Sequence, residues 1–195
     1  MKIVIASSNK GKIKEIKSYW SEYDVVAFSE LIDEFEIEET ENTFAGNAKL
    51  KAEAISNKIG KEYLVIADDS GISVPALGNI PGIYSARFAG IGASDRDNLE
   101  KLIEELKKNS LTATPAFYTC AIAISYKGRV DVVHGWMHGE AISEKRGDKG
   151  FGYDPMFIPE GFSKTLGELE DREKLEISHR TKALKLAKIF IDAII

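Results

Sequence analysis

The sequence predicts a protein of the α/β class, organised as one domain over residues 1–195. Three observations predict it. The 44% hydrophobic and 29% charged residues match an ordinary globular chain that can bury a core. Apolar runs of strand length alternate with segments whose apolar residues recur at helical spacing. No internal repeat and no low-complexity tract is present, which disfavours a repeat array or a disordered chain.

The first half of the chain predicts five elements. They are a strand at 2–6, a helix at 12–23, a strand at 24–28, a helix that ends near 59, and a strand at 63–67. Asn42 and Thr43 are suitable caps for the second helix, and Gly60 is a suitable stop. The last strand is expected to end where the polar run Asp68-Asp69-Ser70-Gly71 begins.

The second half predicts a loop, a helix, a set of strands and a final helix. Residues 72–93 are rich in glycine and are expected to form a loop with one short strand. Ser94 and Asp97 resemble a capping box before a helix at 96–107. The remaining expected elements are strands at 116–126, 129–133 and 140–143, a glycine-rich loop at 146–155 and a helix at 178–194. The inward face of that helix is expected to be Ala183, Ala187, Phe190, Ile191 and Ile194.

Charge and cysteine content limit the partners. The chain has 26 Lys and Arg against 31 Asp and Glu, a net charge of −5. This disfavours nucleic acid or an anionic membrane as the main partner, while a local basic site for a small anion stays possible. The first residues contain too few apolar positions for a signal-peptide core or a membrane span. Cys120 is the only cysteine, so we expect a protein of the reducing cytoplasm.

A candidate phosphate-binding loop follows the first strand. It consists of Ser7, Ser8, Asn9, Lys10, Gly11 and Lys12. A loop between a strand and a helix offers backbone N–H groups and the positive helix end to phosphate. The spacing is not that of a P-loop ATPase. The alternative is an ordinary solvated turn.

Two groups of acidic residues are candidates for a metal site. One contains Glu36, Glu38, Glu39 and Glu41, and the other is the pair Asp68-Asp69 after the buried strand. Mg²⁺ binds through one or two carboxylates together with water and substrate phosphates. A solvated acidic face is the simpler interpretation of the glutamates. The paired aspartates instead require a positive neighbour, because buried charges are costly without one.

Lys51 occupies an unusual position on the expected second helix. At 100° per residue it falls inside the apolar stripe, between Phe44 and Ile55. A lysine there either extends its ammonium group to water or finds an anion. A carboxylate cluster or a phosphate would supply that anion.

Two late segments can recognise a nucleobase. One is Gly150-Phe151-Gly152-Tyr153-Asp154-Pro155, and the other contains Glu173-Lys174 and Ile177-Ser178-His179-Arg180. An aromatic ring between glycines can stack on a base, and Lys, His and Arg can donate to its carbonyl oxygens. Taken alone, each segment is explained as well by turn chemistry or helix capping. A zinc site at His134 and His138 and a nucleophile pair at Ser178-His179 are both disfavoured.

Taken together, these segments resemble the inosine triphosphate pyrophosphatase family, of the bacterial dITP/XTP pyrophosphatase type. The matching pieces are 7–12, Glu38-Glu39-Thr40 with Thr43-Phe44 and Asn47-Ala48, 67–71, Pro81 to Arg87, 150–155, and Glu173-Lys174 with 177–180. They keep the family's order and cover nearly the whole chain. Two departures are visible: Ser7-Ser8-Asn9 stands where Thr-Gly-Asn is common, and Glu41 stands where a glycine often follows the acidic pair.

The resemblance implies a fold and an activity. The fold would be α/β, with a long, mostly antiparallel mixed sheet, flanking helices and two lobes around a nucleotide cleft, usually in a homodimer. The activity would be Mg²⁺-dependent hydrolysis of ITP, dITP and XTP to a nucleoside monophosphate and pyrophosphate, which cleanses the nucleotide pool.

The resemblance also implies roles for single residues. The loop 7–12 would hold the triphosphate, Glu38 and Asp69 would hold Mg²⁺, and Asp69 would accept a proton from the attacking water. Glu39 is the alternative to Glu38 as a ligand. The other substrate contacts would be Ser70, Phe151, Gly152, Tyr153, Asp154, Lys174, His179 and Arg180, supported by Lys51 and Asp68.

Three alternatives remain open at this point. One is a related pyrophosphatase for modified pyrimidine nucleotides. Another is a non-catalytic nucleotide sensor, which would not need the whole acidic set. The third, a single-stranded nucleic acid binder, is disfavoured by the net charge of −5.

Overall fold

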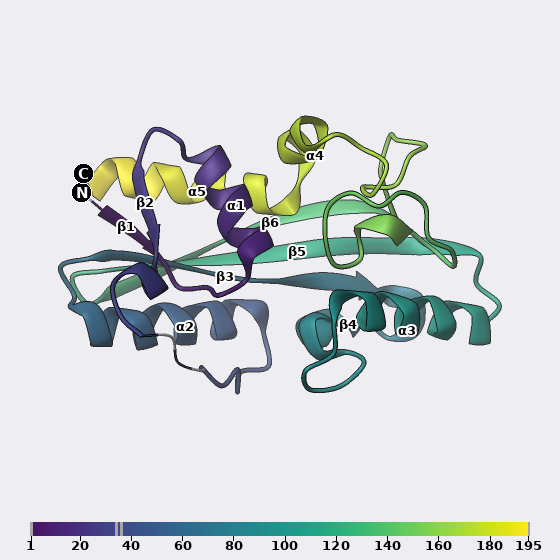
Figure 1. Ribbon diagram of the computed structural model, residues 1–195, viewed down its shortest axis with the longest axis horizontal. Helices are drawn as coiled ribbons and strands as arrows, with labels where there is room; N and C mark the ends of the chain where they lie inside the picture. The colour runs from purple at the N-terminus through teal and green to yellow at the C-terminus, as the bar shows by residue number, and fades with distance from the viewer. Residues whose placement is uncertain (1, 34, 36, 195) are drawn as a thin grey trace. The chain divides into compact units, whose positions relative to one another are not determined.

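The computed structural model describes residues 2–33, 35 and 37–194. Glu36, one of the acidic residues singled out above, lies outside these ranges. The strands are β1 (Lys2–Ile5), β2 (Asp24–Ala27), β3 (Leu64–Val74), β4 (Ile80–Pro81), β5 (Ala113–Tyr126), β6 (Arg129–Ile142) and β7 (Phe157–Pro159). The α-helices are α1 (Lys10–Tyr19), α2 (Phe44–Ile59), α3 (Asp95–Lys108), α4 (Asp171–Ile177) and α5 (His179–Ile194). Figure 1 shows them in chain order.

Of the helix caps read from the sequence, Thr43, Gly60 and the Ser94–Asp97 box are confirmed, whereas Asn42 is not the N-cap of α2. The Thr43 side chain accepts a hydrogen bond from the backbone N–H of Gly46 at the start of α2, and Gly60 ends that helix with a φ of 109°. Ser94 and Asp97 form a reciprocal capping box on α3. Caps are recognisable in sequence because they use local hydrogen bonds and few residue types.

The sequence did not predict α4 and β7, and three other elements differ clearly from the prediction. Strand β3 continues through Asp68 to Val74, where the sequence predicted a loop from residue 72. Strand β6 joins the two strands predicted at 129–133 and 140–143. Helix α1 begins at Lys10 and ends at Tyr19, earlier at both ends than predicted. Polar residues made the two strands look interrupted, although a strand tolerates a polar residue wherever its side chain finds a partner.

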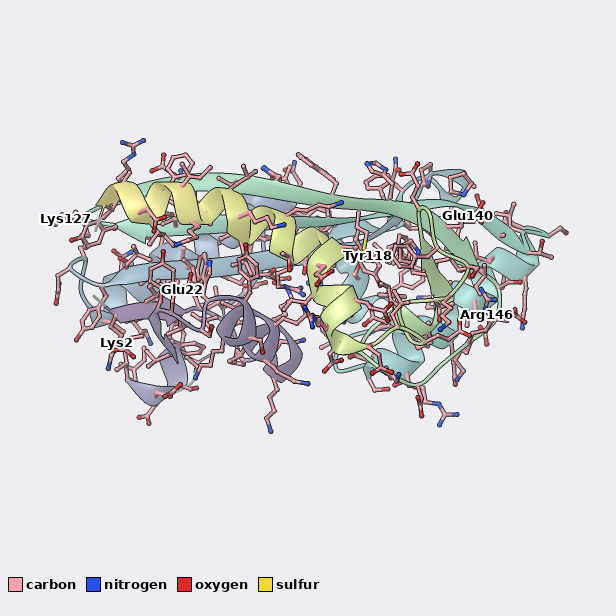
Figure 2. All side chains as sticks on the ribbon, turned by 90° about the horizontal axis from the view of Figure 1, so that it is seen from above. Lys2, Glu22, Tyr118, Lys127, Glu140 and Arg146 are labelled. Carbon is pink, nitrogen blue, oxygen red and sulfur yellow. The ribbon has the colours of Figure 1, made fainter. Side chains whose placement is uncertain are left out.

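A two-residue turn joins β5 to β6. Lys127 and Gly128 both have positive φ angles, of 50° and 80°. Such angles define a type I′ turn, whose twist matches that of a hairpin. Lys127 is labelled at this turn in Figure 2.

The chain forms two compact units. The first contains residues 1–69, 120–135 and 180–195, and the second contains residues 70–119 and 136–179. The long strands β3, β5 and β6 contribute to both units. The chain passes from one unit to the other at four peptide bonds, two of which adjoin candidate site residues: Asp69–Ser70 and His179–Arg180.

The first unit has helices on both faces of its strands. Strand β1 runs parallel to both β2 and β3. Ile3, Ile5, Leu64 and Ile66 pack with α1 and α5 in one cluster, and Val4, Val65 and Ala67 pack with α2 in another. Figure 1 shows α2 on one side of the strands and α1 with α5 on the other. Successive residues of a strand point to opposite faces, so each of these strands is apolar on both.

Helix α5 does not bury the whole face that the sequence predicted. Ala183, Ala187 and Ile191 are buried as expected, together with Leu184. Phe190 and Ile194 are each 37% exposed. Phe190 and Ile194 have the spacing of an inward helical face. The buried face of α5 instead runs through Ala183, Leu184, Ala187 and Ile191.

The second unit builds its core around α3. Leu99, Leu102 and Leu106 of this helix belong to one cluster with Ile72, Tyr118 and Phe157 of the strands. Strand β4 is antiparallel to β3, and β7 is antiparallel to β6. The sheet therefore contains both parallel and antiparallel pairs, as a mixed sheet does. Among the described helices, none is both long and apolar enough to span a membrane.

Candidate active site

The loop 7–12 forms the start of α1. Asn9 is the N-cap, and its side-chain oxygen accepts from the backbone N–H of Lys12 at 3.0 Å. Ser8, Asn9 and Lys10 are exposed. The loop therefore presents polar groups and the positive end of a ten-residue helix to solvent, as expected for a phosphate site.

Asp68 is the centre of a buried ion-pair network. Its Oδ1 atom pairs with the ammonium group of Lys12. Its Oδ2 atom accepts from Arg180 Nε at 2.9 Å and from Cys120 Sγ at 2.9 Å. Arg180 is itself 2% exposed, and its Nη1 atom pairs with Glu15. The positive neighbours that the sequence required for a buried aspartate are thus present.

Asp69 belongs to a second cluster, with Lys51 and Glu39. The Lys51 ammonium group lies 2.9 Å from Asp69 Oδ1 and 2.9 Å from Glu39 Oε1. Lys51 therefore binds two carboxylates rather than extending to water. Asp69 Oδ2 is buried and has no hydrogen-bond partner among the described residues. The cluster leaves one carboxylate oxygen available for chemistry.

The two aspartates titrate in opposite directions. Burial alone would raise the pKa of the Asp68 carboxyl, but Arg180 and Lys12 outweigh it and hold that pKa well below its ordinary value. Burial raises the pKa of Asp69, and Lys51 and Lys12 only partly offset the effect. A pair of acids whose pKa values are pushed apart is typical of acid–base catalysis. Asp68 suits a permanent anion, and Asp69 suits a proton acceptor.

The structure separates the two candidate glutamates. Glu39 is half-buried and contacts Lys51, which also binds Asp69. Glu38 is exposed. Asn47 of α2 supports this segment, because its side-chain oxygen accepts from the backbone N–H of Glu41 at 3.0 Å. Of the two glutamates, Glu39 is the one that the fold brings to Asp69.

The second unit assembles Phe151, Asp154 and Lys174. Asp154 Oδ2 accepts from Lys174 Nζ at 2.7 Å and from the backbone N–H of Phe151 at 2.9 Å. The Lys174 ammonium lies 4.6 Å from the centre of the Phe151 ring. Gly150 has a φ of 77°, and a Cβ atom there would lie 2.1 Å from Asp154 Oδ2. Asp154 thus fixes the aromatic loop, and Gly150 leaves the space for it.

The other predicted substrate contacts of this unit are His179, Tyr153, Gly152 and Ser70, and each has a defined place in the structure. His179 stacks on Tyr118, with 4.6 Å between ring centres; Tyr118 is labelled in Figure 2. The hydroxyl of Tyr153 donates to the backbone oxygen of Ser85 at 2.7 Å. The backbone N–H of Gly152 donates to Asp95 at 3.0 Å. Ser70 is half-buried within β3.

Sequence reasoning missed four residues that support these clusters: Glu15, Asn47 as a hydrogen-bonding partner, Tyr118 and Cys120. Glu15 follows Lys12 by three positions, so helical spacing could have placed both on one face. Asn47 belonged to one of the motifs that match the family, but the motif does not indicate that its side chain binds the backbone of Glu41. Nothing local marks Tyr118 or Cys120, because their partners are distant in sequence.

A family model described as the Ham1 family matches residues 3–190. The chain belongs to the Ham1 family. A relative named dITP/XTP pyrophosphatase from Nautilia profundicola is 59% identical, and the alignment covers 100% of this chain and 99% of the relative.

Solved structures agree with this membership. The Ham1 protein of Staphylococcus aureus is 42% identical, with a TM-score of 0.86 over 100% of both chains. A HAM1 protein from Coxiella burnetii is 33% identical, with a TM-score of 0.87 over 99% of both chains. These similarities to Ham1 proteins confirm the family resemblance and the mixed α/β fold that it implied.

Proposed function

We propose that this protein hydrolyses non-canonical purine nucleoside triphosphates, namely ITP, dITP and XTP, to a nucleoside monophosphate and pyrophosphate. The observation that carries the proposal is the Glu39–Lys51–Asp69 cluster, in a chain 59% identical over its full length to a relative named dITP/XTP pyrophosphatase. Such a reaction needs a positioned triphosphate, neutralised charge and a group that orients or deprotonates water. Lys12, from the Asp68 network, would position the triphosphate and neutralise its charge. Asp69, from the cluster with Glu39 and Lys51, would act on the water.

The residues around Asp69 fit a magnesium ion. Asp69 Oδ2 is a buried carboxylate oxygen without a partner among the described residues, and Glu39 binds the same lysine as Asp69. Two carboxylates are sufficient, since Mg²⁺ usually keeps several waters and substrate phosphates as its other ligands. We assign Asp69 and Glu39 as its protein ligands, in preference to Glu38. When bound, Mg²⁺ would neutralise phosphate charge and lower the pKa of bound water.

The residues of the first unit would act on the triphosphate. Lys12 and the N–H groups at the start of α1 would bind phosphate oxygens. Asp69, with its raised pKa, would accept a proton from the attacking water. Lys51 would hold Asp69 by Oδ1, so that Oδ2 would face both the metal and the water from which it takes the proton.

The residues of the second unit would recognise the base. The Phe151 ring can stack on any base, since every base has a π-face. Lys174 and His179 can donate to the oxygen at the purine 6-position, where adenine carries an amino group instead. Arg180 donates to Asp68 and Glu15 in this structure, so its contact with the nucleoside remains an expectation of the resemblance.

A nucleotide panel tests the proposal. Purified protein with Mg²⁺ is incubated with ITP, dITP, XTP, ATP, GTP and modified pyrimidine triphosphates, and pyrophosphate and orthophosphate are measured separately. We expect pyrophosphate from ITP and XTP, and little from ATP. A preference for pyrimidines would favour the related pyrophosphatase, binding without turnover would favour a sensor, and orthophosphate with a diphosphate product would exclude the proposed reaction.

The proposal includes two properties of the resemblance, a homodimer and the cytoplasm as compartment. An interface between two copies would cover exposed apolar residues such as Tyr84, which is 55% exposed, and Ile91, which is 100% exposed. Light scattering on the purified protein measures the mass directly. A mass near twice 21.5 kDa is expected. Fractionation of cells measures the compartment.

A further inference from the structure

The buried carboxylate of Asp68 is held by groups from three separate elements. Lys12 comes from α1, Arg180 from α5 and Cys120 from the middle of β5. Lys12 pairs with one carboxylate oxygen, and Arg180 and Cys120 share the other. Asp68 is 2% exposed and Cys120 is fully buried. Water therefore has little access to this carboxylate.

Cys120 faces this carboxylate as a thiol. Burial, together with the nearby Asp68 charge, raises the pKa of the Cys120 thiol well above its ordinary value. The sulfur thus keeps its proton and can donate it. Its neighbours on the same strand face, Ile122 and Ile124, pack in an apolar cluster, where a cysteine would normally act as a small apolar residue. The separation of 2.9 Å between Cys120 Sγ and Asp68 Oδ2 is a polar contact instead.

Lys12 has two competing anions. In this structure it pairs with Asp68, and under the proposed function it binds the triphosphate. When Lys12 turns to phosphate, Asp68 Oδ1 loses this ion pair. Arg180 and Cys120, which bind Oδ2, then carry a larger share of the buried charge. A buried charge that loses a partner is strongly unfavourable.

We propose that Cys120 is a positioning residue: its S–H donates to Asp68 Oδ2 and holds the buried carboxylate in place when Lys12 leaves it for the triphosphate. The role of Lys12 in this inference rests on the proposed function. Without the thiol donor, Asp68 depends more on Lys12, so Lys12 is less available to phosphate. The loss should appear in nucleotide binding rather than in the chemical step.

Two substitutions at Cys120 distinguish the effect of losing the hydrogen-bond donor from the effect of losing side-chain volume. Cys120→Ala removes the donor, and the KM for ITP should rise between about twofold and tenfold, the range of a single hydrogen bond, with kcat within twofold of the wild type. Cys120→Ser keeps a donor and should restore the wild-type KM. Ile122→Val is the matched control, because it removes volume from the same buried face without touching Asp68. It should lower the melting temperature and leave KM unchanged.

A spectroscopic measurement tests the contact in the wild-type protein. Cys120 is the only cysteine, so the infrared S–H stretching band belongs to it alone. A hydrogen-bonded thiol absorbs at lower frequency than an unbonded one. We expect the band below the position of an unbonded thiol, and a further decrease when inorganic triphosphate is added, because Asp68 then relies more on Cys120.

The outcomes distinguish this inference from the proposed function. If the wild type hydrolyses ITP but Cys120→Ala and Cys120→Ser have the same KM, the positioning role is wrong and the function stands. If the wild type hydrolyses no nucleotide, the function is wrong, and the S–H band and the Kd of inorganic triphosphate for the same variants decide the positioning role. A band at the unbonded position, or no effect of saturating triphosphate on it, overturns the inference.

Discussion

The carboxylates of Asp68 and Asp69 are directed to opposite faces of strand β3. Asp68 contacts residues of α1, α5 and β5, and Asp69 contacts Lys51 of α2. Consecutive side chains of a strand alternate between the two faces, so one strand delivers two acids to two environments. Two adjacent residues of the same type thereby acquire different chemistry, a permanent anion and a proton acceptor.

Asp69→Asn tests the proton acceptor. The variant keeps the shape of the side chain but loses its basicity, so kcat for ITP should fall by at least about 10². The fold should survive, because a carboxyl with a raised pKa gives up stability when it ionises at neutral pH, and asparagine removes that ionisation. Pyrophosphate release and thermal unfolding are measured on the same preparation. A turnover near that of the wild type would place the base elsewhere.

Glu39→Gln and Glu38→Gln separate the two candidate metal ligands. Glu39 binds the same lysine as Asp69, whereas Glu38 is exposed. Loss of a ligand weakens metal binding, so Glu39→Gln should raise the Mg²⁺ concentration for half-maximal rate by about tenfold or more. Glu38→Gln, the matched control, should change it little. A larger effect of Glu38→Gln than of Glu39→Gln on the Mg²⁺ requirement would identify Glu38 as the ligand.

Lys51→Met should change the pH dependence of the reaction. The Lys51 ammonium lowers the pKa of Asp69 and partly offsets its burial. Without that charge the pKa of Asp69 rises further, so the acid limb of the kcat–pH profile should move upward by about one unit or more. Lys49→Met is the control, since Lys49 is an exposed lysine of the same helix. An unmoved acid limb in the Lys51 variant would show that Asp69 does not control it.

Asp68→Asn should destabilise the protein in a pH-dependent manner. The folded pKa of Asp68 is well below its unfolded value of about 3.9, so its ionised form stabilises the fold above that pH. The contribution is lost as pH falls from the unfolded pKa toward the folded one. In urea unfolding without metal, the free energy of unfolding of the variant should be lower than that of the wild type by about 3 kcal/mol or more near neutral pH. This difference in free energy should become smaller below about pH 4. A difference independent of pH would contradict this.

Gly150→Ala should impair nucleotide binding more than Gly152→Ala. Both glycines have positive φ angles, 77° and 60°, so both substitutions strain the backbone. Only at Gly150 would the new Cβ meet Asp154, at 2.1 Å from Oδ2, and that carboxylate holds both Phe151 and Lys174. KM for ITP is measured in both variants. Equal effects would show that backbone strain, and not displacement of Asp154, matters here.

Much of the fold could be predicted because its signals are local. The caps of α2 and α3, the hairpin turn at Lys127-Gly128 and the periodicity of the helices depend on residues within a few positions of one another. The ends of β3 and β6 could not be predicted in this way. Asp68 lies inside a buried strand, and its charge is compensated by Arg180, which is distant in sequence.

The same distinction between local and long-range signals applies to the candidate site. The sequence by itself determined the residue types and their order: a polar loop before a helix, an acidic pair after an apolar strand, a lysine within an apolar stripe and an aromatic between glycines. Only the tertiary structure decided the partners. It joined Lys51 to Glu39 rather than Glu38 and brought Arg180 and Cys120 to Asp68. It also left one oxygen of Asp69 without a hydrogen-bond partner in the described part of the chain. The physical reason is that a charge in a low-dielectric interior is set by the groups packed around it, and packing brings together residues that no local pattern connects.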